Sequence, residues 1–303
     1  MTTLSKPAPV DGDHTREALY YDPANAFDFR WPPVPRRQFV TERDRAFDSA
    51  TATGLVALDA SEALQTAYPA TTPSLLAQYL RLRAGERYEG CQRASGEVYF
   101  VMHGSGESRC GADTVAWREG DLFCFPGGQE TLHAAGDEDA LLFCANDAPL
   151  VAFQGLQPPR AGEALVETVH WPVGEIDKRL ETVYARERSE EEAGRAVLFS
   201  SRSLAPARNI LPMMAAAINT LEAGGDQRPH RHNGVAITLA LQGEGVYSLI
   251  EGERIDWLTG AAQITPATEL HSHHNRGPAR MRSLVIQDEG LHYYTRTPGF
   301  SWG

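Results

Sequence analysis

The feature that most constrains this chain of 303 residues is an internal repeat of one β-type module. When the chain is aligned on itself, LRAGERYEGCQRASGEVYFVMHGSG (82–106) matches LEAGGDQRPHRHNGVAITLALQGEG (221–245) at its turn glycines. After one inserted residue, WREGDLFCFPGGQETLH (117–133) matches WLTGAAQITPATELHSH (257–273) at a tryptophan, a glycine and a proline. Two copies of one module predict two similar domains in one chain.

Each copy consists of short apolar runs separated by glycine-containing turns, such as EVYFVMHGSG and DLFCFPGG in the first copy. Regularly spaced runs of this kind are typical of an all-β sandwich or barrel. The charge pattern of GEIDKRLETVYARERSEEEAGR (174–195) predicts a solvated helix between the copies.

The expected organisation has four parts. The beginning of the chain is proline-rich and irregular, and we expect it to pack as an arm on another surface. The predicted ranges are an N-terminal arm (1–70), a first barrel (71–160), a connector with a helix (161–205) and a second barrel (206–303).

The composition narrows the class of protein. Hydrophobic residues make up 42% and charged residues 22% of the chain, as in soluble globular proteins, and the formal net charge is −12. An acidic chain without a basic stripe is a poor partner for nucleic acid or for an anionic membrane surface. The sequence shows no apolar stretch of membrane-spanning length, no signal-peptide core, and four cysteines without a CxxC pairing. We therefore expect a cytoplasmic protein with reduced cysteines and with no nucleic-acid or membrane partner.

Histidines are concentrated in the second copy. His230 and His232 stand two residues apart ahead of an apolar run, and His271, His273 and His274 follow further along. Residues i and i+2 of a strand share one face, so His230 and His232 project together. A single histidine in a strand is more often a core or surface residue, whereas a pair on one face with a third histidine favours a divalent metal ion.

The spacing of these histidines with glycines and a proline resembles the two sequence motifs of the cupin superfamily. The first motif is met by Gly224, His230, His232 and Gly243, and the second by Gly260, Pro266, His271 and Asn275, with Thr268 in a glycine place. Because both copies carry the spacing, the chain resembles a two-domain cupin, or bicupin. The resemblance implies two double-stranded β-helix (jelly-roll) barrels and a metal held by His230, His232 and His271.

Ala236 stands at the place of the motif's glutamate. Cupins with three histidines and no carboxylate include iron(II) dioxygenases, and the second copy is most similar to the gentisate and salicylate 1,2-dioxygenase group. The resemblance implies an extradiol-type, ring-cleaving nonheme enzyme that uses Fe(II) and O2 on a small hydroxylated aromatic acid. Mn, Ni or Zn are the other metals we expect such a site to accept. His273 matches a histidine of that group and is the expected acid/base or substrate contact.

Two other functions fit the same motifs. One is a metal-binding cupin without oxygenase activity, and the other is a metal-dependent isomerase or lyase. Oxygen consumption with iron(II) and a panel of phenolic acids separates these functions from a dioxygenase. In each case we expect a homo-oligomer.

The expected substrate contacts lie on strands of the second copy. The resemblance to the gentisate and salicylate group implies an arginine that holds the substrate carboxylate, and here Thr238 stands in its place. Arg282 either faces the barrel and replaces that arginine or is an exposed strand residue. Gln242 and Trp257 are further expected pocket residues, although an aromatic strand residue is more often part of the core.

The first copy lacks the ligand set. Cys91, Arg93 and Thr131 stand where the second copy has its three histidines, while Glu97 and His133 keep their motif places. A permanently charged arginine cannot ligate a cation. We therefore expect the first barrel to be a structural partner without a metal of its own.

Overall fold

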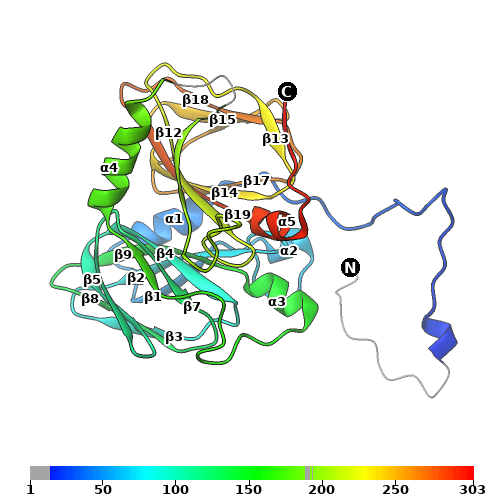
Figure 1. Cartoon of the computed structure of the whole chain (residues 1–303), viewed down its shortest axis with the longest axis horizontal. Helices are drawn as coiled ribbons and strands as arrows, with labels where there is room; N and C mark the ends of the chain where they lie inside the picture. Colours follow the sequence, from blue (N-terminus) through cyan, green and yellow to red (C-terminus); the bar gives the residue numbers. More distant parts are fainter. Residues whose placement is uncertain (1–13, 188–191, 193) are drawn as a thin grey trace.

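The computed structural model describes residues 14–187, 192 and 194–303 (Figure 1). Residues 1–13 of the expected arm, and 188–191 and 193 of the expected connector helix, lie outside the described residues. The described chain forms two antiparallel β-barrels, and α4 (Val173–Tyr184) runs along one side of them. An all-β fold with two barrels is therefore confirmed.

The first barrel consists of a six-stranded sheet in the order β1-β2-β9-β4-β7-β10 and a four-stranded sheet in the order β3-β8-β5-β6. Its strands are β1 (Gly54–Ala57), β2 (Leu76–Leu82), β3 (Arg87–Gly90), β4 (Gly96–His103), β5 (Ser105–Cys110), β6 (Asp113–Arg118), β7 (Leu122–Pro126), β8 (Thr131–Ala135), β9 (Ala140–Asn146) and β10 (Val169–Trp171).

The second barrel consists of two five-stranded sheets, in the orders β11-β12-β19-β14-β17 and β16-β15-β18-β13-β20. Its strands are β11 (Arg195–Phe199), β12 (Ala215–Leu221), β13 (His230–His232), β14 (Ala236–Gln242), β15 (Val246–Ile250), β16 (Glu253–Asp256), β17 (Ala262–Thr265), β18 (His271–Asn275), β19 (Met281–Gln287) and β20 (Phe300–Trp302). The remaining helices are η1 (His14–Glu17), α1 (Val40–Phe47), α2 (Ser61–Leu64), α3 (Ala148–Gln154) and α5 (Glu289–Thr295).

One apolar core joins the two barrels, between the six-stranded sheet of the first and the sheet of the second that contains β14. Side chains alternate along a strand, so Ile237 and Leu239 of β14 join this core while Thr238 points into the second barrel. The hydroxyl of Tyr79 crosses the interface and donates to the carbonyl oxygen of Gly260 at 2.8 Å. Each sheet therefore covers apolar surface that the other would leave in water.

Parts of the expected arm and connector are built into the sheets. β1 pairs with β2, β10 pairs with β7, and β11 pairs with β12. The N–H of Ile264 in the second barrel also donates to the carbonyl oxygen of Arg37 at 2.9 Å. The sheets thus extend beyond 71–160 and 206–303, because the outer backbone groups of β2, β7 and β12 find hydrogen-bond partners in the flanking segments.

The connector helix α4 is shorter than the predicted 174–195, and one of its faces is not solvated. Ile176 and Leu180 are buried in the shared core. α4 ends at Tyr184, whose carbonyl oxygen accepts a hydrogen bond from Nη1 of Arg195 at 2.7 Å. A basic side chain that takes a terminal carbonyl satisfies a group left open by the end of the helix. Within the described part of the chain, no helix has both the length and the apolarity needed to cross a membrane.

Candidate metal centre and substrate cavity

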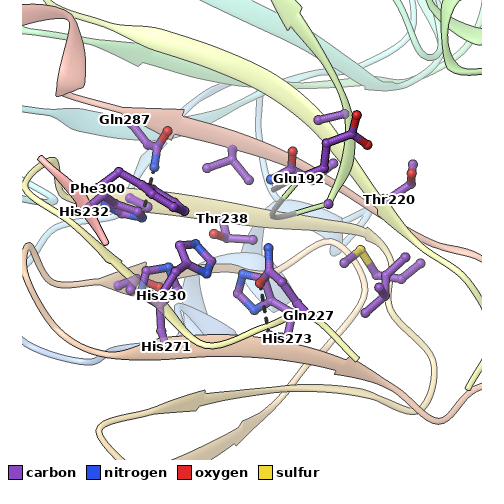
Figure 2. A pocket seen from close by; sticks show the side chains of 18 of the residues that line it. Glu192, Thr220, Gln227, His230, His232, Thr238, His271, His273, Gln287 and Phe300 are labelled. Atoms are coloured by element: carbon purple, nitrogen blue, oxygen red, sulfur yellow. Dashed lines mark hydrogen bonds between the residues drawn. The ribbon is translucent and has the colours of Figure 1, made fainter. Parts of the chain in front are cut away.

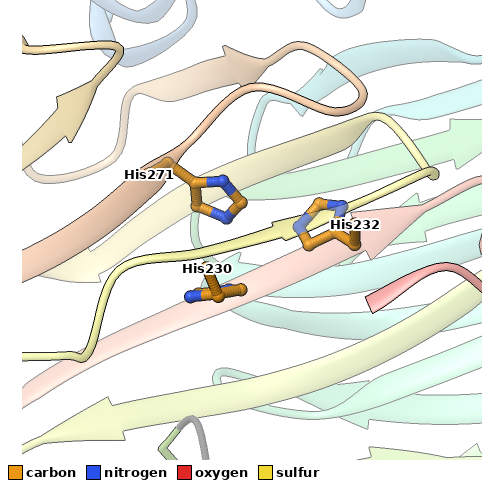
Figure 3. Close-up of side chains that lie close together, drawn as sticks. All are labelled: His230, His232 and His271. Atoms are coloured by element: carbon orange, nitrogen blue, oxygen red, sulfur yellow. The ribbon is translucent and has the colours of Figure 1, made fainter. Parts of the chain in front are cut away.

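Three histidines of the second barrel converge on one point (Figure 3). His230 and His232 lie on one face of β13, and His271 begins β18 as the register partner of His230. One ring nitrogen of each lies within 4.8 Å of the others, and all three side chains are buried. Among the residues that the structure describes, no other group of three His, Cys, Asp or Glu side chains has this geometry.

Main-chain carbonyl groups fix the orientation of the three rings. Each Nδ1 faces the carbonyl oxygen of a residue two positions away: His230 with Arg228 at 3.1 Å, His232 with Gly234 at 2.7 Å, and His271 with Glu269 at 2.9 Å. A carbonyl oxygen only accepts, so each Nδ1 carries the ring proton and each Nε2 keeps its lone pair as an acceptor or metal ligand. Proteins commonly orient imidazole ligands for a metal in this way.

The protonation state of the three rings also fits a metal. Burial lowers the pKa of His230 and of His232, and burial with the neighbouring histidines lowers that of His271 to about 2. Nε2 of His232 lies 3.2 Å from the side-chain nitrogen of Gln287, as expected for an acceptor that points into the barrel. Neutral imidazoles with converging lone pairs suit Fe, Mn, Ni or Zn.

A strained turn leads from β17 into β18, the strand that begins with His271. Thr268, in the glycine place of the cupin motif, adopts a left-handed φ of 65°. A β-branched residue is strained there, and the strain persists only where surrounding contacts hold it. The N–H of Thr268 donates to the carbonyl oxygen of His232 at 2.7 Å. This bond ties the backbone of one expected ligand to the turn that places His271.

A cavity of about 330 Å³ opens at the three histidines (Figure 2). Its volume is in the range of small-molecule sites. Thr238 lies in its wall, and so does His273. The other lining residues include Val285, Gln287, Glu289 and Phe300.

The repeat explains why the interior of the second barrel is open and that of the first is filled. The backbone pairing places Tyr99, Phe123 and Cys144 side by side in the first barrel, as it places Thr238, Gln263 and Val285 in the second. The ring of Tyr99 stacks on Phe123, with 5.0 Å between centroids, and lies 4.6 Å from the ring of His133. A space of only about 10 Å³ remains there. Small and polar side chains in place of aromatic rings therefore open the second barrel.

At the ligand places of the first barrel, Cys91 is exposed, and Nη2 of Arg93 contacts the side-chain oxygen of Gln157 at 3.2 Å. Glu97 is buried and accepts a hydrogen bond from the hydroxyl of Tyr99 at 2.7 Å. Burial raises the pKa of Glu97 to about 7. These side chains do not converge as the three histidines of the second barrel do.

His273 shares the cavity with the three histidines but has different hydrogen-bond partners. Its Nδ1 lies 2.9 Å from Oγ of Ser248. The same Oγ lies 2.8 Å from Nε1 of Trp257 and 2.6 Å from Nε2 of Gln263. Burial lowers the pKa of His273 to about 3, so its ring is neutral. The neighbouring His274 does not line the cavity, and its Nδ1 lies 2.5 Å from Oδ1 of Asp226.

Three expected substrate contacts lie outside the cavity wall. Arg282 is on the opposite face of β19, with Nη1 2.8 Å from Oδ1 of Asp177 on α4, so it cannot replace the missing arginine. Gln242 is exposed, because a β-bulge between Ala240 and Gln242 reverses the alternation of side chains. Trp257 packs behind His273, with ring centroids 5.3 Å apart, within a small apolar cluster.

Other cavity residues were not identified from the sequence. Phe300 reaches the site because β20 pairs with β13, and its ring stacks on His230 with 5.3 Å between centroids. No local pattern connects these distant segments. Gln263 does not line the cavity but contacts Ser248 behind His273. It could have been found from the sequence, since the repeat aligns it with Phe123 and so exchanges a ring for an amide at a buried place.

Sequence comparison supports the cupin assignment. Residues 217–287 match the cupin domain family. A 5-aminosalicylate 1,2-dioxygenase from Comamonas sp. is 30% identical over 161 residues. This match covers 50% of the present chain and 42% of the relative, so it spans less than half of that enzyme's length.

Solved structures show the same fold. The salicylate 1,2-dioxygenase of Pseudaminobacter salicylatoxidans superposes with a TM-score of 0.76 at 14% identity, over 95% of each chain. An adduct of salicylate 1,2-dioxygenase with gentisate gives 0.75 at 13% identity, over 100% of this chain and 97% of that one. A cupin 2 conserved barrel domain protein from Leptotrichia buccalis gives 0.52 at 13% identity, over 84% and 98%. The chain thus has the bicupin fold.

Proposed function

We propose that this bicupin chain is a nonheme iron(II)-dependent dioxygenase that cleaves the ring of a small hydroxylated aromatic acid of the salicylate or gentisate type. The observation that carries the proposal is the set of three neutral histidines whose Nε2 atoms face the cavity of about 330 Å³ inside the second barrel, whereas the matching interior of the first barrel is filled. The partial identity to a 5-aminosalicylate 1,2-dioxygenase supports the reaction class. An extradiol-type position of cleavage is part of the proposal.

His230, His232 and His271 would hold the metal through Nε2. When bound, iron(II) supplies Lewis acidity and one-electron chemistry toward O2. Three neutral ligands leave the charge of a divalent ion uncompensated, which favours an anionic, chelating substrate. Mn, Ni or Zn would be held by the same set.

The cavity wall explains how an aromatic acid can bind without the missing arginine. Among the residues that the structure describes, no Arg or Lys side chain lines the cavity. A substrate carboxylate would therefore be neutralised at the metal ion and not by a protein cation. Val285 and Phe300 offer apolar surface to a ring, while Thr238 and Gln287 offer hydrogen bonds to its polar substituents.

The test combines metal analysis with oxygen uptake. The full chain is loaded anaerobically with iron(II) and then mixed with O2 and salicylate, gentisate or 5-aminosalicylate. We expect one metal per chain and uptake of O2 with at least one of these acids. His232→Ala should lose both, whereas His133→Ala in the first barrel, which matches His273 in the repeat, should keep both.

Two outcomes would overturn the proposal. A chain that binds the metal but consumes no O2 with any acid would be a metal-binding cupin without oxygenase activity. Conversion of an acid without O2 uptake would indicate an isomerase or lyase.

We also propose that the chain forms a homo-oligomer. The first described residues of the arm extend away from the barrels in Figure 1, and six large apolar side chains of the arm are exposed: Leu19, Tyr20, Tyr21, Phe27, Phe29 and Trp31. Apolar surface gathered in one segment favours contact with another chain. A monomer in analytical ultracentrifugation at micromolar concentration would contradict this.

A further inference from the structure

We infer that Gln263 is a positioning residue that holds His273 in the tautomer with its proton on Nε2. In that tautomer His273 presents a hydrogen-bond donor to an oxygen of the substrate and cannot act as a fourth Nε2 ligand of the metal. The role in substrate binding rests on the proposed function, whereas the tautomer itself does not.

The inference follows from the hydrogen bonds at one hydroxyl group. Oγ of Ser248 contacts Nε1 of Trp257 at 2.8 Å, Nε2 of Gln263 at 2.6 Å and Nδ1 of His273 at 2.9 Å. A serine hydroxyl has two lone pairs and one hydrogen. The indole and amide N–H groups occupy both lone pairs, so the hydroxyl hydrogen must point to Nδ1 of His273. Nδ1 is then an acceptor, and the proton of the neutral ring is on Nε2.

The assignment of the Ser248 lone pairs depends on the orientation of the Gln263 amide. In the structure its Nε2 donates to Ser248, and its Oε1 has no partner. With the amide turned over, the NH2 group would be the one left without a partner in a side chain that is only 2% exposed. Buried N–H groups without acceptors are rarer than carbonyl groups without donors. The orientation with Nε2 on Ser248 is therefore favoured.

The four histidines of the cavity thus divide into two kinds. His230, His232 and His271 carry their protons on Nδ1, because carbonyl oxygens accept from that atom. His273 carries its proton on the other nitrogen, although it stands only two residues after His271 on the same face of β18. Nε2 carries a lone pair in the first group and an N–H donor in His273. Three histidines can bind a cation, and the fourth can bind an anionic or carbonyl oxygen.

The first barrel shows what the same arrangement lacks without the glutamine. Oγ of Ser108 lies 2.7 Å from Nδ1 of His133 and 2.8 Å from Nε1 of Trp117, as in the second barrel. Phe123 occupies the place of Gln263 and donates no hydrogen bond. Ser108 therefore keeps one lone pair, and its hydroxyl can accept from His133 as well as donate to it. The serine and tryptophan alone do not fix the tautomer.

The experiment is ¹⁵N NMR of the histidine rings in the full chain loaded with zinc(II), which is diamagnetic. Wild-type protein is compared with Gln263→Leu and with the matched control Phe123→Leu in the first barrel. The signals of His273 are assigned by their loss in His273→Gln. We expect an Nε2–H pattern for His273 in wild type and in Phe123→Leu, and a mixture of tautomers in Gln263→Leu. With iron(II), kcat/KM of Gln263→Leu should fall in proportion to the fraction of molecules in which His273 still carries its proton on Nε2. For an even mixture of the two tautomers the fall is about twofold, and the metal content should not change.

An Nδ1–H pattern for His273 in wild type would overturn the inference, and this result does not depend on whether the variant folds. An unchanged His273 pattern in a folded Gln263→Leu variant would also overturn it. The predicted tautomers without any O2 uptake would leave the role of Gln263 standing and refute the proposed function instead.

Discussion

His230 and His271 are register partners in the pair formed by β13 and β18, and 4.3 Å separates the centroids of their rings. Main-chain pairing, and not a flexible loop, therefore sets the distance between two of the three proposed ligands. His232 joins them because it follows His230 on the same face of β13. A site carried by paired strands is formed before the metal binds, which reduces the free energy spent on ordering the ligands.

The first prediction concerns Arg282. Its ion pair with Asp177 lies on the outer face of the sheet, so Arg282→Met should leave KM for the aromatic acid unchanged. The pair is partly exposed, and its loss should cost at most about 1 kcal/mol of unfolding free energy. Arg280→Met, which removes the neighbouring pair with Glu181, is the matched control. A large rise of KM in Arg282→Met alone would show that Arg282 reaches the substrate after all.

The second prediction tests whether the cavity is the substrate site. Tyr99 fills the first barrel at the place that Thr238 occupies in the second, so Thr238→Tyr should fill the second barrel in the same way. We expect one metal per chain to remain and turnover to be lost. Thr238→Val, which keeps the size, should lose no more than the effect of one hydrogen bond, about tenfold in kcat/KM. Normal turnover in folded Thr238→Tyr would place the substrate elsewhere.

The third prediction concerns the pH dependence of stability and uses Glu97. Its pKa is about 7 in the folded chain because it is buried, and near 4.5 otherwise. Folding therefore takes up a proton between these values. The stabilisation is fully present below the lower value and is lost as the pH rises through the higher one. The difference corresponds to roughly 3 kcal/mol of unfolding free energy.

The variant Glu97→Gln keeps an acceptor for Tyr99 but takes up no proton. Measured by urea unfolding, the stability of the variant relative to wild type should increase by roughly 3 kcal/mol between about pH 4 and about pH 8. The contribution of the buried histidines to the pH dependence of stability is the same in both proteins, so it cancels in the difference. Glu107→Gln, which removes a carboxylate paired with Arg109, is the matched control. A difference for Glu97→Gln that does not change with pH would mean that Glu97 is not held protonated.

The sequence was sufficient to predict the two barrels, because the repeated turn glycines are local features, and its resemblance to the cupin motifs was sufficient to predict the convergence of the three histidines. The sequence was not sufficient to predict which face of β19 carries Arg282. Leu284 and Ile286, on the same outer face of β19, are apolar because the other barrel covers them. A strand that is buried on both sides shows no contrast between its faces, so the sequence pattern does not reveal which side faces the cavity.

The position of Gln242 could not be predicted from the sequence either. Uninterrupted alternation from Thr238 places it inside the barrel, and the bulge after Ala240 turns it out. A one-residue irregularity inverts the faces of all the residues that follow it in the strand. Nothing in LALQG marks the bulge.

The measurement that tests the central claim most directly is the fate of ¹⁸O2. The iron(II)-loaded chain is supplied with ¹⁸O2 and with the aromatic acid that gives the fastest oxygen uptake, and the product is analysed by mass spectrometry. A ring-cleaving dioxygenase inserts both atoms of one O2 molecule, one into a new carboxylate and one into a keto group. The ring-opened product should therefore carry two ¹⁸O atoms, or one after the keto oxygen has exchanged with water, and His232→Ala should form none of it. A product with the ring intact, or a ring-opened product with no labelled atom, would contradict the account.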